Sequence, residues 1–437
     1  MFPLLLVISF DAFMFQYFED KTLHLPNFES LMNRGVVAKL QPQFTSKTFP
    51  NHWAMVSGLY EENNNIVGNS MYDDKIGYFH FGSTDLFVWN KWMTTRYTGE
   101  PIWHTNEQSK TEIRHSGVYH WPGSYVAEIN GSASATYVKH YNQSNAFNFT
   151  LAADTVVEWF TSKKDVNFVM LYFPEPDNTS HGFGPMAPET LRKVEEVDTG
   201  LGYLIRSLKK HPDIWNQLDM IVLSDHGMSE IHTTIDVSDL KNKTEVFVVE
   251  SSVLGIRPQK NETDFILEQL RSISNVTVYF KDEVPERYHY RKSERIMEII
   301  AVADEGFAFC ECKIYGAKAQ HGYDPLYSDM HGIFVGSGPS FRSGYKRNVS
   351  IEPIDTHAIM THILKVSGPK NDGNLSRVED MLRFSFFDGF AKEEAQRKQN
   401  DLWSQVSSAT SSVSASTAIS NFASILTLFA FLQRYLF

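Results

Sequence analysis

PLLLVISF at residues 3–10 is a run in which every residue but Ser9 is apolar, and it ends directly at Asp11. A run of this length with a single polar residue is typical of a strand that is buried on both faces. Three further runs have the same character, at residues 166–173, 218–223 and 332–335. Between them apolar residues recur at helical spacing, most clearly from Glu189 to Lys210. Strands that alternate with amphipathic helices predict an α/β fold with a mostly parallel central sheet and helices on both faces.

The length and composition of the chain fit this fold. Its 437 residues are enough for one large α/β domain around a single sheet. With 42% hydrophobic residues, 14% aromatic residues and a net charge of −12, the chain is globular in composition rather than disordered. The acidic balance argues against a nucleic-acid partner, because phosphate backbones attract basic surfaces.

Residues 234–312 have a secondary-structure pattern of their own. We expect strands at 245–249 and 276–280 around a helix at 263–272, which predicts a small inserted α+β subdomain. Cys310 and Cys312 are the two cysteines of the chain, and they lie two residues apart on an expected strand. A bridge between them would be strained, so we interpret both as free thiols.

The chain changes character after about residue 393. We therefore predict a catalytic domain at residues 1–393, a charged and then Ser-rich linker at 394–420, and a hydrophobic tail at 421–437. Small residues followed by a terminal apolar run resemble a lipid-anchor signal, and a single transmembrane helix is the alternative. We expect this tail to anchor the protein to a membrane.

An excess of glycosylation sequons suggests the secretory pathway. Asn-x-Ser/Thr occurs nine times, where composition alone would give roughly three. The sequons begin at Asn130, Asn142, Asn148, Asn178, Asn242, Asn261, Asn275, Asn348 and Asn374. We therefore expect N-glycans and a cell-surface or extracellular location. The apolar run at residues 3–10 leads into Asp11, a candidate metal ligand, so we do not expect it to be a cleaved signal peptide. Either a signal peptide lies upstream of this sequence, or this form is not secreted.

Carboxylates and histidines follow several of the expected strands. In parallel sheets functional residues collect at the carboxyl ends of the strands. Zinc takes carboxylate and imidazole ligands, and a catalytic zinc keeps one position open. Two candidate sets can be formed from Asp11, Asp225 and His226, and from Asp177, His181 and His321.

KTFPNH at residues 47–52 supplies a candidate nucleophile. Pro50 suits the first turn of a helix that runs on through Leu59, which puts Thr48 at the helix N-terminus. Free backbone amides and the helix dipole favour a phosphate there. A threonine hydroxyl is a poor nucleophile at neutral pH, but coordination to zinc would lower its pKa and aim it.

The motifs together resemble the ectonucleotide pyrophosphatase/phosphodiesterase family. They are SFD at 9–11, TFPNH at 48–52, EPD at 175–177 with His181, SDHGM at 224–228 and HGYD at 321–324, in the same order as in that family. The resemblance extends from Pro3 to about Gly368. It implies a fold similar to alkaline phosphatase and a hydrolase that cleaves phosphodiester or pyrophosphate bonds.

The resemblance also implies roles for individual residues. Two zinc ions would be bound, one by Asp11, Thr48, Asp225 and His226, and the other by Asp177, His181 and His321. Thr48 would attack phosphorus to form a phospho-threonine, which water then hydrolyses, while Asn51 would hold a phosphate oxygen. Phe49, Tyr172 and Tyr137 would bind the nucleobase or another leaving-side group.

Three positions depart from the family pattern. Ala12 stands where the family generally has glycine, which reduces backbone freedom there. Ser180 also replaces a glycine and creates the sequon at Asn178, whose glycan would crowd the site, so we expect that sequon to be unused. Tyr125 stands where nucleotide-cleaving relatives tend to have an acidic residue, which leaves the substrate open.

Nucleotide pyrophosphates or phosphodiesters outside the cell are the expected substrates. A phospholipid or choline phosphodiesterase with the same zinc site is the alternative enzyme. A third hypothesis is an inactive cell-surface binding protein that keeps the fold and the glycans.

Overall fold

The computed structural model describes residues 3–383, apart from 84, 94–97, 110–111, 126–127, 130–131, 141–146 and 312–315. One compact unit spans Met1–Arg383. Several sequence-based predictions therefore lie outside the described residues. They are the domain end at 393, the linker, the hydrophobic tail, Cys312, and the sequons at Asn130 and Asn142.

An eight-stranded sheet forms the centre of the fold, as the apolar runs predicted. In spatial order it consists of β20 (Tyr345–Lys346), β2 (Val36–Leu40), β19 (Gly332–Ser337), β10 (Leu218–Leu223), β1 (Leu4–Phe10), β9 (Val166–Phe173), β5 (His115–Tyr119) and β8 (Tyr137–Lys139). Of these eight strands, β19 runs opposite to the rest, because it pairs antiparallel with both β10 and β2. The prediction of a mostly parallel sheet is confirmed.

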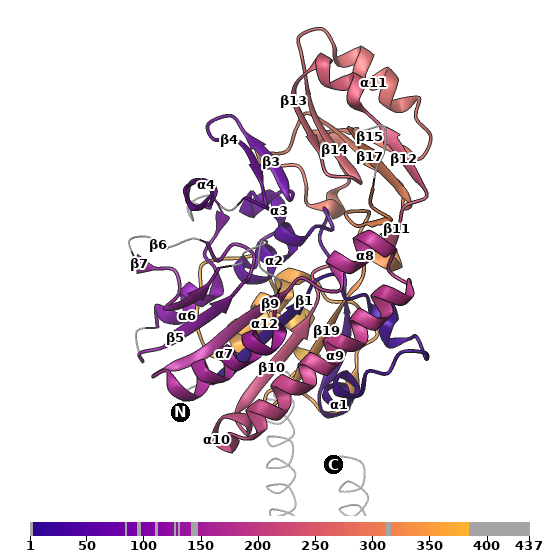
Figure 1. Cartoon of the computed structure of the whole chain (residues 1–437). Helices are drawn as coiled ribbons and strands as arrows, with labels where there is room; N and C mark the ends of the chain where they lie inside the picture. The colour runs from indigo at the N-terminus through magenta and orange to yellow at the C-terminus, as the bar shows by residue number, and fades with distance from the viewer. Residues whose placement is uncertain are drawn as a thin grey trace, which may run out of the picture. The chain divides into compact units, whose positions relative to one another are not determined.

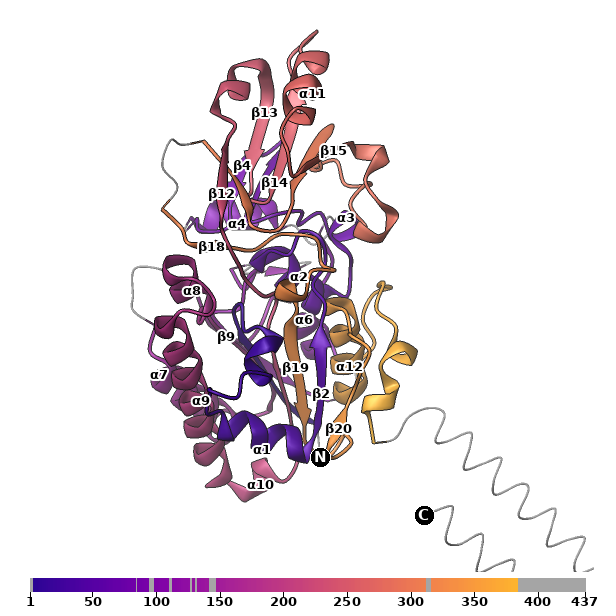
Figure 2. The same cartoon turned by 90° about the vertical axis from the view of Figure 1, so that its right-hand side faces the viewer.

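Helices cover both faces of this sheet (Figures 1 and 2). The alternation of β1 explains the two layers: Leu5 and Val7 belong to one buried cluster, and Leu6 and Ile8 to the other. Helices α2, α6 and α12 contribute to the first cluster, and α1, α7 and α9 to the second. A strand with apolar residues on both faces can be stable only between two such layers.

The helices have the following bounds: α1 Pro26–Arg34, α2 Thr48–Ser57, α3 Glu61–Asn64, α4 Leu86–Trp92, α6 Ile102–Glu107, α7 Phe149–Ser162, α8 Asp177–Phe183, α9 Pro188–Lys209, α10 Pro212–Trp215, α11 Thr263–Arg271 and α12 Pro353–Leu364. The helical spacing from Glu189 to Lys210 corresponds to α9. Helix α2 ends at Ser57, two residues before the expected Leu59, because Gly58 takes a left-handed conformation with φ 68°.

A second, four-stranded antiparallel sheet lies within residues 234–312. Its order is β13 (Thr244–Val249), β14 (Val253–Pro258), β16 (Ile299–Ala303) and β15 (Val276–Phe280). Together with α11 it has a hydrophobic cluster of its own, which includes Leu254, Ile266 and Ile299. Beside it β12 (Thr233–Asp236) pairs with β17 (Phe307–Cys310). The exact boundaries of the inserted subdomain stay a prediction.

Short strand pairs complete the described part of the chain: β3 (Ser70–Asp73) with β4 (Gly77–His80), β6 (Glu128–Ile129) with β7 (Ser132–Ala133), and β11 (Ser229–Glu230) with β18 (Ala319–Gln320). Both views place the inserted subdomain beyond the end of the central sheet where α2 and α8 lie (Figures 1 and 2).

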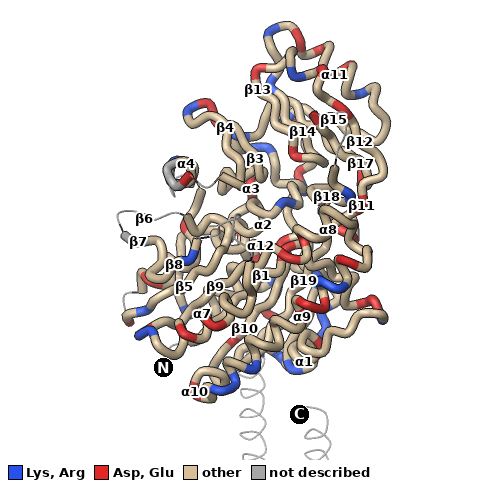
Figure 3. The backbone as a smooth tube through the Cα atoms, in the orientation of Figure 1, with Lys and Arg blue, Asp and Glu red and all other residues tan. Residues whose placement is uncertain are grey.

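Basic and acidic residues are interspersed along the inserted subdomain and along α1, α9 and α10 (Figure 3). Among the described residues, no helix has both the length and the apolar character needed to cross a membrane.

Candidate active site

Three parallel strands, β1, β9 and β10, position the candidate ligands at their carboxyl ends. Asp11 follows β1 directly, and Asp225 and His226 follow β10 after Ser224. Asp177 begins α8, just beyond β9, and its backbone amide donates to the Asp11 carbonyl at 3.2 Å. The structure therefore brings together residues that are more than 200 positions apart in the sequence.

The first candidate ligand set consists of Asp11, Asp225 and His226. One ligand atom from each residue lies within 4.8 Å of the others. Nε2 of His226 is 3.0 Å from Oδ2 of Asp225 and 3.5 Å from Oδ1 of Asp11. All three side chains are almost completely buried. Two carboxylates and one imidazole around a common point are a donor set that suits zinc.

The second set consists of Asp177, His181 and His321. Nε2 of His181 is 3.3 Å and Nε2 of His321 is 3.8 Å from the same atom, Oδ1 of Asp177. Asp177 and His181 are one helical turn apart on α8, where the sequence had suggested a single loop. His321 follows β18, on the segment that returns from the inserted subdomain. The two sets adjoin, because the rings of His226 and His321 stack with centroids 3.7 Å apart.

Backbone carbonyls orient the three imidazoles in the same way. Nδ1 of His226 lies 2.8 Å from the Gly227 carbonyl, Nδ1 of His181 lies 2.9 Å from the Ala319 carbonyl, and Nδ1 of His321 lies 2.8 Å from the Ser46 carbonyl. Each Nδ1–H is thus a donor to a carbonyl, which leaves Nε2 with its lone pair. Metal-binding histidines are held in this tautomer by such contacts.

The carboxylates give a direct test of whether cations fit. Oδ1 of Asp11, Oδ1 of Asp177 and Oδ2 of Asp225 are buried, and no hydrogen bond among the described residues reaches them. These are the same atoms that face the histidine Nε2 atoms. Buried carboxylate oxygens normally have partners. Divalent cations at the two sets would supply them, so the residues present fit a two-metal site.

The titration behaviour of the site points the same way. Burial and the nearby carboxylates of Asp225 and Asp177 raise the pKa of Asp11 well above its ordinary value. Burial also acts on Asp225, but His226 and His52 outweigh it and lower the pKa of this carboxyl. Without a cation, Asp11 and Asp225 therefore favour one proton between them. A divalent cation would allow both to be ionised.

Thr48 lies at the first position of α2, as predicted. Its Oγ1 is 3.2 Å from Nε2 of His226, so the hydroxyl belongs to the first set. The next backbone amide, that of Phe49, donates to Oδ1 of Asn69 at 2.9 Å. Thr48 thus stands between a candidate cation and the positive end of a helix dipole, where a phosphate is favoured.

His52 is a residue of the site that the sequence reasoning did not single out. One ring nitrogen, Nε2, lies 2.8 Å from Ser9 Oγ, and the other lies 2.8 Å from the Thr48 carbonyl and 3.4 Å from Oδ2 of Asp225. His52 was visible only as part of the TFPNH motif. Its contacts show that it braces both the candidate nucleophile, Thr48, and a candidate ligand, Asp225.

The structure corrects the prediction for Asn51. Its side-chain amide donates to the carbonyls of Thr45 and Lys47, and its Oδ1 accepts the amide of Gln43. Both amide hydrogens are used, so this side chain shapes the loop before α2 and keeps no donor for a phosphate oxygen. Asn69 is the asparagine beside Thr48 instead. No sequence motif marks Asn69, because it lies 20 residues from Phe49 in the chain and comes next to α2 only in the folded protein.

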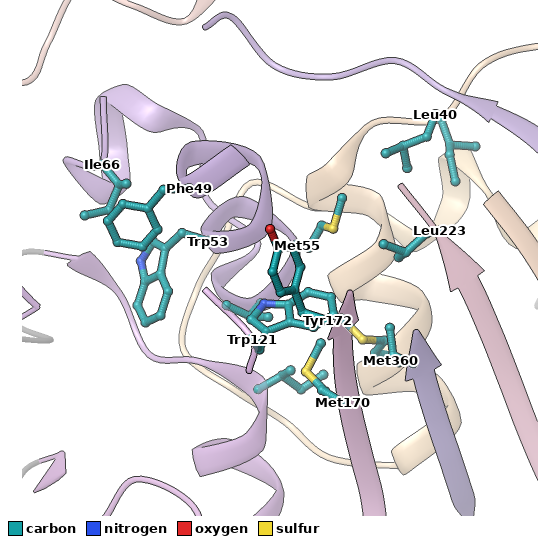
Figure 4. Close-up of a cluster of buried hydrophobic side chains, with 14 of the residues drawn as sticks. Leu40, Phe49, Trp53, Met55, Ile66, Trp121, Met170, Tyr172, Leu223 and Met360 are labelled. Atoms are coloured by element: carbon teal, nitrogen blue, oxygen red, sulfur yellow. The ribbon is translucent and has the colours of Figure 1, made fainter. Parts of the chain in front are cut away.

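The three predicted aromatic binding residues lie in different surroundings. Phe49 is fully buried among Trp53, Phe79, Phe81 and Trp89, and Figure 4 shows its ring beside Trp53 and Ile66. Tyr172 is also buried, and its hydroxyl donates to Asp11. Tyr137 is on the edge strand β8, where its ring packs near Trp159 and His115. The structure does not bring these three rings together into one surface.

The positions that depart from the family pattern have clear structural settings. Ala12 takes a left-handed conformation with φ 54°, and its amide donates to Oδ1 of Asp225 at 3.2 Å. Ser180 is buried, whereas Asn178 is exposed on α8. The ring of Tyr125 lies between those of Trp89 and His140, at centroid distances of 4.8 Å and 5.0 Å.

Comparison with known proteins identifies the family. A model of the family described as Type I phosphodiesterase / nucleotide pyrophosphatase matches residues 5–324. The chain belongs to the type I phosphodiesterase/nucleotide pyrophosphatase family. Membership makes it a hydrolase, and it confirms the resemblance drawn from the motifs.

Relatives in this family align along most of the chain. Human ectonucleotide pyrophosphatase/phosphodiesterase family member 5 is 34% identical over 387 residues, which cover 86% of this chain and 77% of the relative. Mouse bis(5'-adenosyl)-triphosphatase enpp4 is 36% identical over 389 residues, which cover 87% of this chain and 81% of the relative.

Solved structures of the type I phosphodiesterase family share the fold. Murine ENPP5, in an inactive threonine-to-alanine variant in complex with AMP, matches with a TM-score of 0.79 and 33% identity, over 87% of this chain and 100% of the murine chain. Human ENPP5 matches with a TM-score of 0.78, 33% identity and the same coverage. These matches confirm the α/β fold class.

Proposed function

We propose that the protein uses two zinc ions and a threonine nucleophile to hydrolyse phosphodiester or pyrophosphate bonds of extracellular nucleotides. The observation that carries this proposal is the pair of buried carboxylate and imidazole sets beside the Thr48 hydroxyl. Asp11, Thr48, Asp225 and His226 would hold one ion, and Asp177, His181 and His321 the other. Bound zinc would lower the pKa of the threonine hydroxyl and of the hydrolytic water and would neutralise phosphate charge.

The residues of the chain account for the remaining requirements. Thr48 Oγ1 would attack phosphorus, form the phospho-threonine and expel the leaving group. His52 and the Gly227 carbonyl hold Asp225 and His226 in place around it. Because Oδ1 of Asn69 accepts the Phe49 amide, the NH2 group of the same side chain lies near the start of α2. We assign to Asn69 the role of donor to a non-bridging phosphate oxygen.

The name of one relative and the ligand of another support a nucleotide substrate. The name of the mouse relative is that of a bis(5'-adenosyl)-triphosphatase, and the murine ENPP5 variant was solved with AMP. That variant is inactive and carries a threonine-to-alanine change, which agrees with a threonine nucleophile. The products from a nucleotide substrate would include a nucleoside monophosphate.

We also propose an extracellular, N-glycosylated protein anchored through its C-terminal tail. All seven sequon asparagines that the structure describes are exposed: Asn148, Asn178, Asn242, Asn261, Asn275, Asn348 and Asn374. Exposure is a requirement for carrying a glycan on the folded protein. Of these, we expect Asn178 to stay unmodified, because it lies between Asp177 and His181.

The deciding experiment measures release of p-nitrophenol from the p-nitrophenyl ester of thymidine 5'-monophosphate. The secreted protein would be compared with Thr48→Ala, with and without zinc, and with p-nitrophenyl phosphorylcholine as the alternative substrate. We expect zinc-dependent turnover of the nucleotide ester that is lost in Thr48→Ala. Preference for the phosphorylcholine ester would contradict a nucleotide substrate, and a fully active Thr48→Ala variant would contradict the nucleophile.

A further inference from the structure

The turn between β13 and β14 of the inserted subdomain touches the active site at three consecutive residues. Glu250, Ser251 and Ser252 form this turn. Their own backbone is held rigidly, since the Glu250 amide donates to the Val253 carbonyl at 2.8 Å and the Ser252 carbonyl accepts the Ala303 amide at 2.8 Å. The turn is therefore a fixed part of the four-stranded sheet rather than a free loop.

The two serines connect the nucleophile loop with the His321 loop. The ammonium group of Lys47 donates to Ser251 Oγ at 3.0 Å and to the His321 carbonyl at 2.8 Å. Ser252 Oγ donates to the same carbonyl at 3.2 Å. Lys47 is 4% exposed and directly precedes Thr48, so these contacts lie in the interior, one residue from the nucleophile.

Glu250 holds a second segment beside the nucleophile. Its carboxylate accepts the backbone amides of Asn69 at 2.7 Å and Ser70 at 2.5 Å. Asn69 in turn accepts the Phe49 amide at the start of α2. A carboxylate that accepts two amides gives strong, directional hydrogen bonds, which fix the position of the Asn69 side chain.

Packing leaves little freedom at this junction. A Cβ atom on Gly322 would lie 2.3 Å from Ser252 Oγ and 2.5 Å from Cε of Lys47. Gly322 also has φ +107°, a conformation that other residues rarely adopt. The His321–Gly322 backbone, the lysine stem and the serine hydroxyl are thus packed directly against one another.

We propose that Glu250, Ser251 and Ser252 are positioning residues, and that this turn of the inserted subdomain sets the distance between Thr48 and His321. It does so through Lys47, Asn69 and the His321 carbonyl, without contact to substrate. The inference rests on the proposed function, in which Thr48 and His321 serve the two halves of one two-zinc site. It gives the inserted subdomain a catalytic purpose beyond its own stability.

The test uses two variants of the turn and two controls in the same subdomain. Ser251→Ala/Ser252→Ala removes both hydroxyl groups. Glu250→Gln replaces one of the two carboxylate oxygens, which accept the backbone amides of Asn69 and Ser70, by an NH2 donor. Ser272→Ala and Glu268→Gln change exposed residues at and after α11 and serve as matched controls. Ser252→Ala alone keeps the test decisive where the double variant does not fold.

Three quantities would be measured on the full chain: kcat and KM for the thymidine ester, zinc affinity by competition with a chelator, and the midpoint of thermal unfolding. For the turn variants we expect kcat to fall about ten-fold with KM changed less than about two-fold, and the affinity for one zinc ion to fall about ten-fold. The controls should match wild type in all three. Loss of a merely structural contact would lower the unfolding midpoint and leave kcat and zinc affinity of the folded fraction intact.

Each outcome separates this inference from the proposed function. Turn variants with wild-type kcat and zinc affinity would overturn the positioning role, while zinc-dependent turnover by wild type would still support the proposed function. A wild type that binds zinc without turnover would overturn the proposed function, and the zinc affinities of the turn variants would still decide the positioning role. A wild-type protein that neither binds zinc nor turns over substrate would overturn both the proposed function and the positioning role.

Discussion

The Tyr172 hydroxyl donates a 2.5 Å hydrogen bond to Oδ2 of Asp11, and it thereby turns Oδ1 of the same carboxylate toward His226. Tyr172→Phe removes this hydrogen bond and keeps the ring. We expect kcat/KM to fall about ten-fold, because partners that orient a metal ligand typically contribute that much. Tyr203→Phe is the matched control, since Tyr203 donates to Asp154 on the distant helices α9 and α7. Equal activity of both variants would contradict the orienting role of Tyr172.

Two asparagines near Thr48 should differ in what they support. Asn69→Ala removes the proposed phosphate donor, and we expect kcat to fall about 100-fold; because the Phe49 amide also loses its acceptor, the unfolding midpoint should fall by the loss of one hydrogen bond. Asn51→Ala removes three hydrogen bonds to the backbone of the loop before α2, and we expect it to lower the unfolding midpoint as well. Steady-state kinetics and calorimetry on both variants check this. An unaffected kcat in Asn69→Ala would contradict the proposal that Asn69 donates to the phosphate.

Ala12→Gly should stabilise the protein. Ala12 has φ 54°, a left-handed conformation that costs a residue with a Cβ atom about 1 kcal/mol relative to glycine. The free energy of unfolding should therefore rise by up to about 1 kcal/mol, measured by denaturant titration. Ala153→Gly, in the middle of α7, should lower it by a similar amount. Destabilisation by Ala12→Gly would show that the conformation of Ala12 carries no strain.

Two adjacent glutamates should respond to pH with opposite sign. Glu61 is buried, and burial raises its pKa well above the ordinary value, although the backbone amide of Thr45 acts in the opposite direction. The native state thus binds a proton that the unfolded state releases, so stability falls as pH rises above the ordinary glutamate pKa. Glu61→Gln should remove this loss and raise the unfolding midpoint at pH 7 by roughly 2–4 °C, with the gain vanishing near pH 4.

Glu62 is the matched control for that prediction. Burial would raise its pKa, but Lys292 and the backbone amide of Arg291 outweigh burial and lower it. Its contribution to stability is present above the ordinary glutamate pKa and is lost as pH falls through the lowered value. Glu62→Gln should therefore lower the unfolding midpoint at pH 7 and have little effect in acid. A change of the unfolding midpoint at pH 7 in the same direction for Glu61→Gln and Glu62→Gln would contradict the opposite pKa shifts of the two residues.

The sequon at Asn178 should stay unmodified in active protein. Its neighbours Asp177 and His181 form part of the second candidate ligand set. Glycopeptide mapping of the secreted protein should find Asn178 without a glycan and the exposed Asn261 and Asn275 modified. A fully occupied Asn178 in protein that turns over substrate would defeat this prediction.

The central strands could be predicted from sequence because burial on two faces leaves a run that is apolar at all but one position. Residues 3–10, 166–173 and 218–223 became β1, β9 and β10, almost to the residue. The edge strand β8, with only three residues, has no such run. The reversed direction of β19 also has no local signal, since strand direction depends on how the chain returns from the inserted subdomain.

The two candidate ligand sets, whose members lie close together in the structure, could be proposed from sequence because each residue follows a strand end or belongs to a short motif. Asn69 and Glu250 could not, because they are 181 residues apart and meet only in the folded chain. Asn51 was assigned to phosphate through the resemblance of the TFPNH motif to the family. On a helix, a side chain three residues further along leans back over the preceding turn, and that of Asn51 reaches the loop at Gln43 and Lys47 instead.

The central position of β1 has a consequence for synthesis of the protein. Strand β1 pairs with β9 and β10, and β10 ends at Leu223, so more than 200 further residues must emerge from the ribosome after β1 before it has both neighbours. Until then an apolar, unpaired strand is available for wrong contacts, and non-local parallel pairing is slow. His321 emerges later still, so a nascent chain of this protein has both candidate ligand sets only near the end of translation of the folded unit. Dependence on chaperones during production should therefore be strongest in the interval before β10 is made.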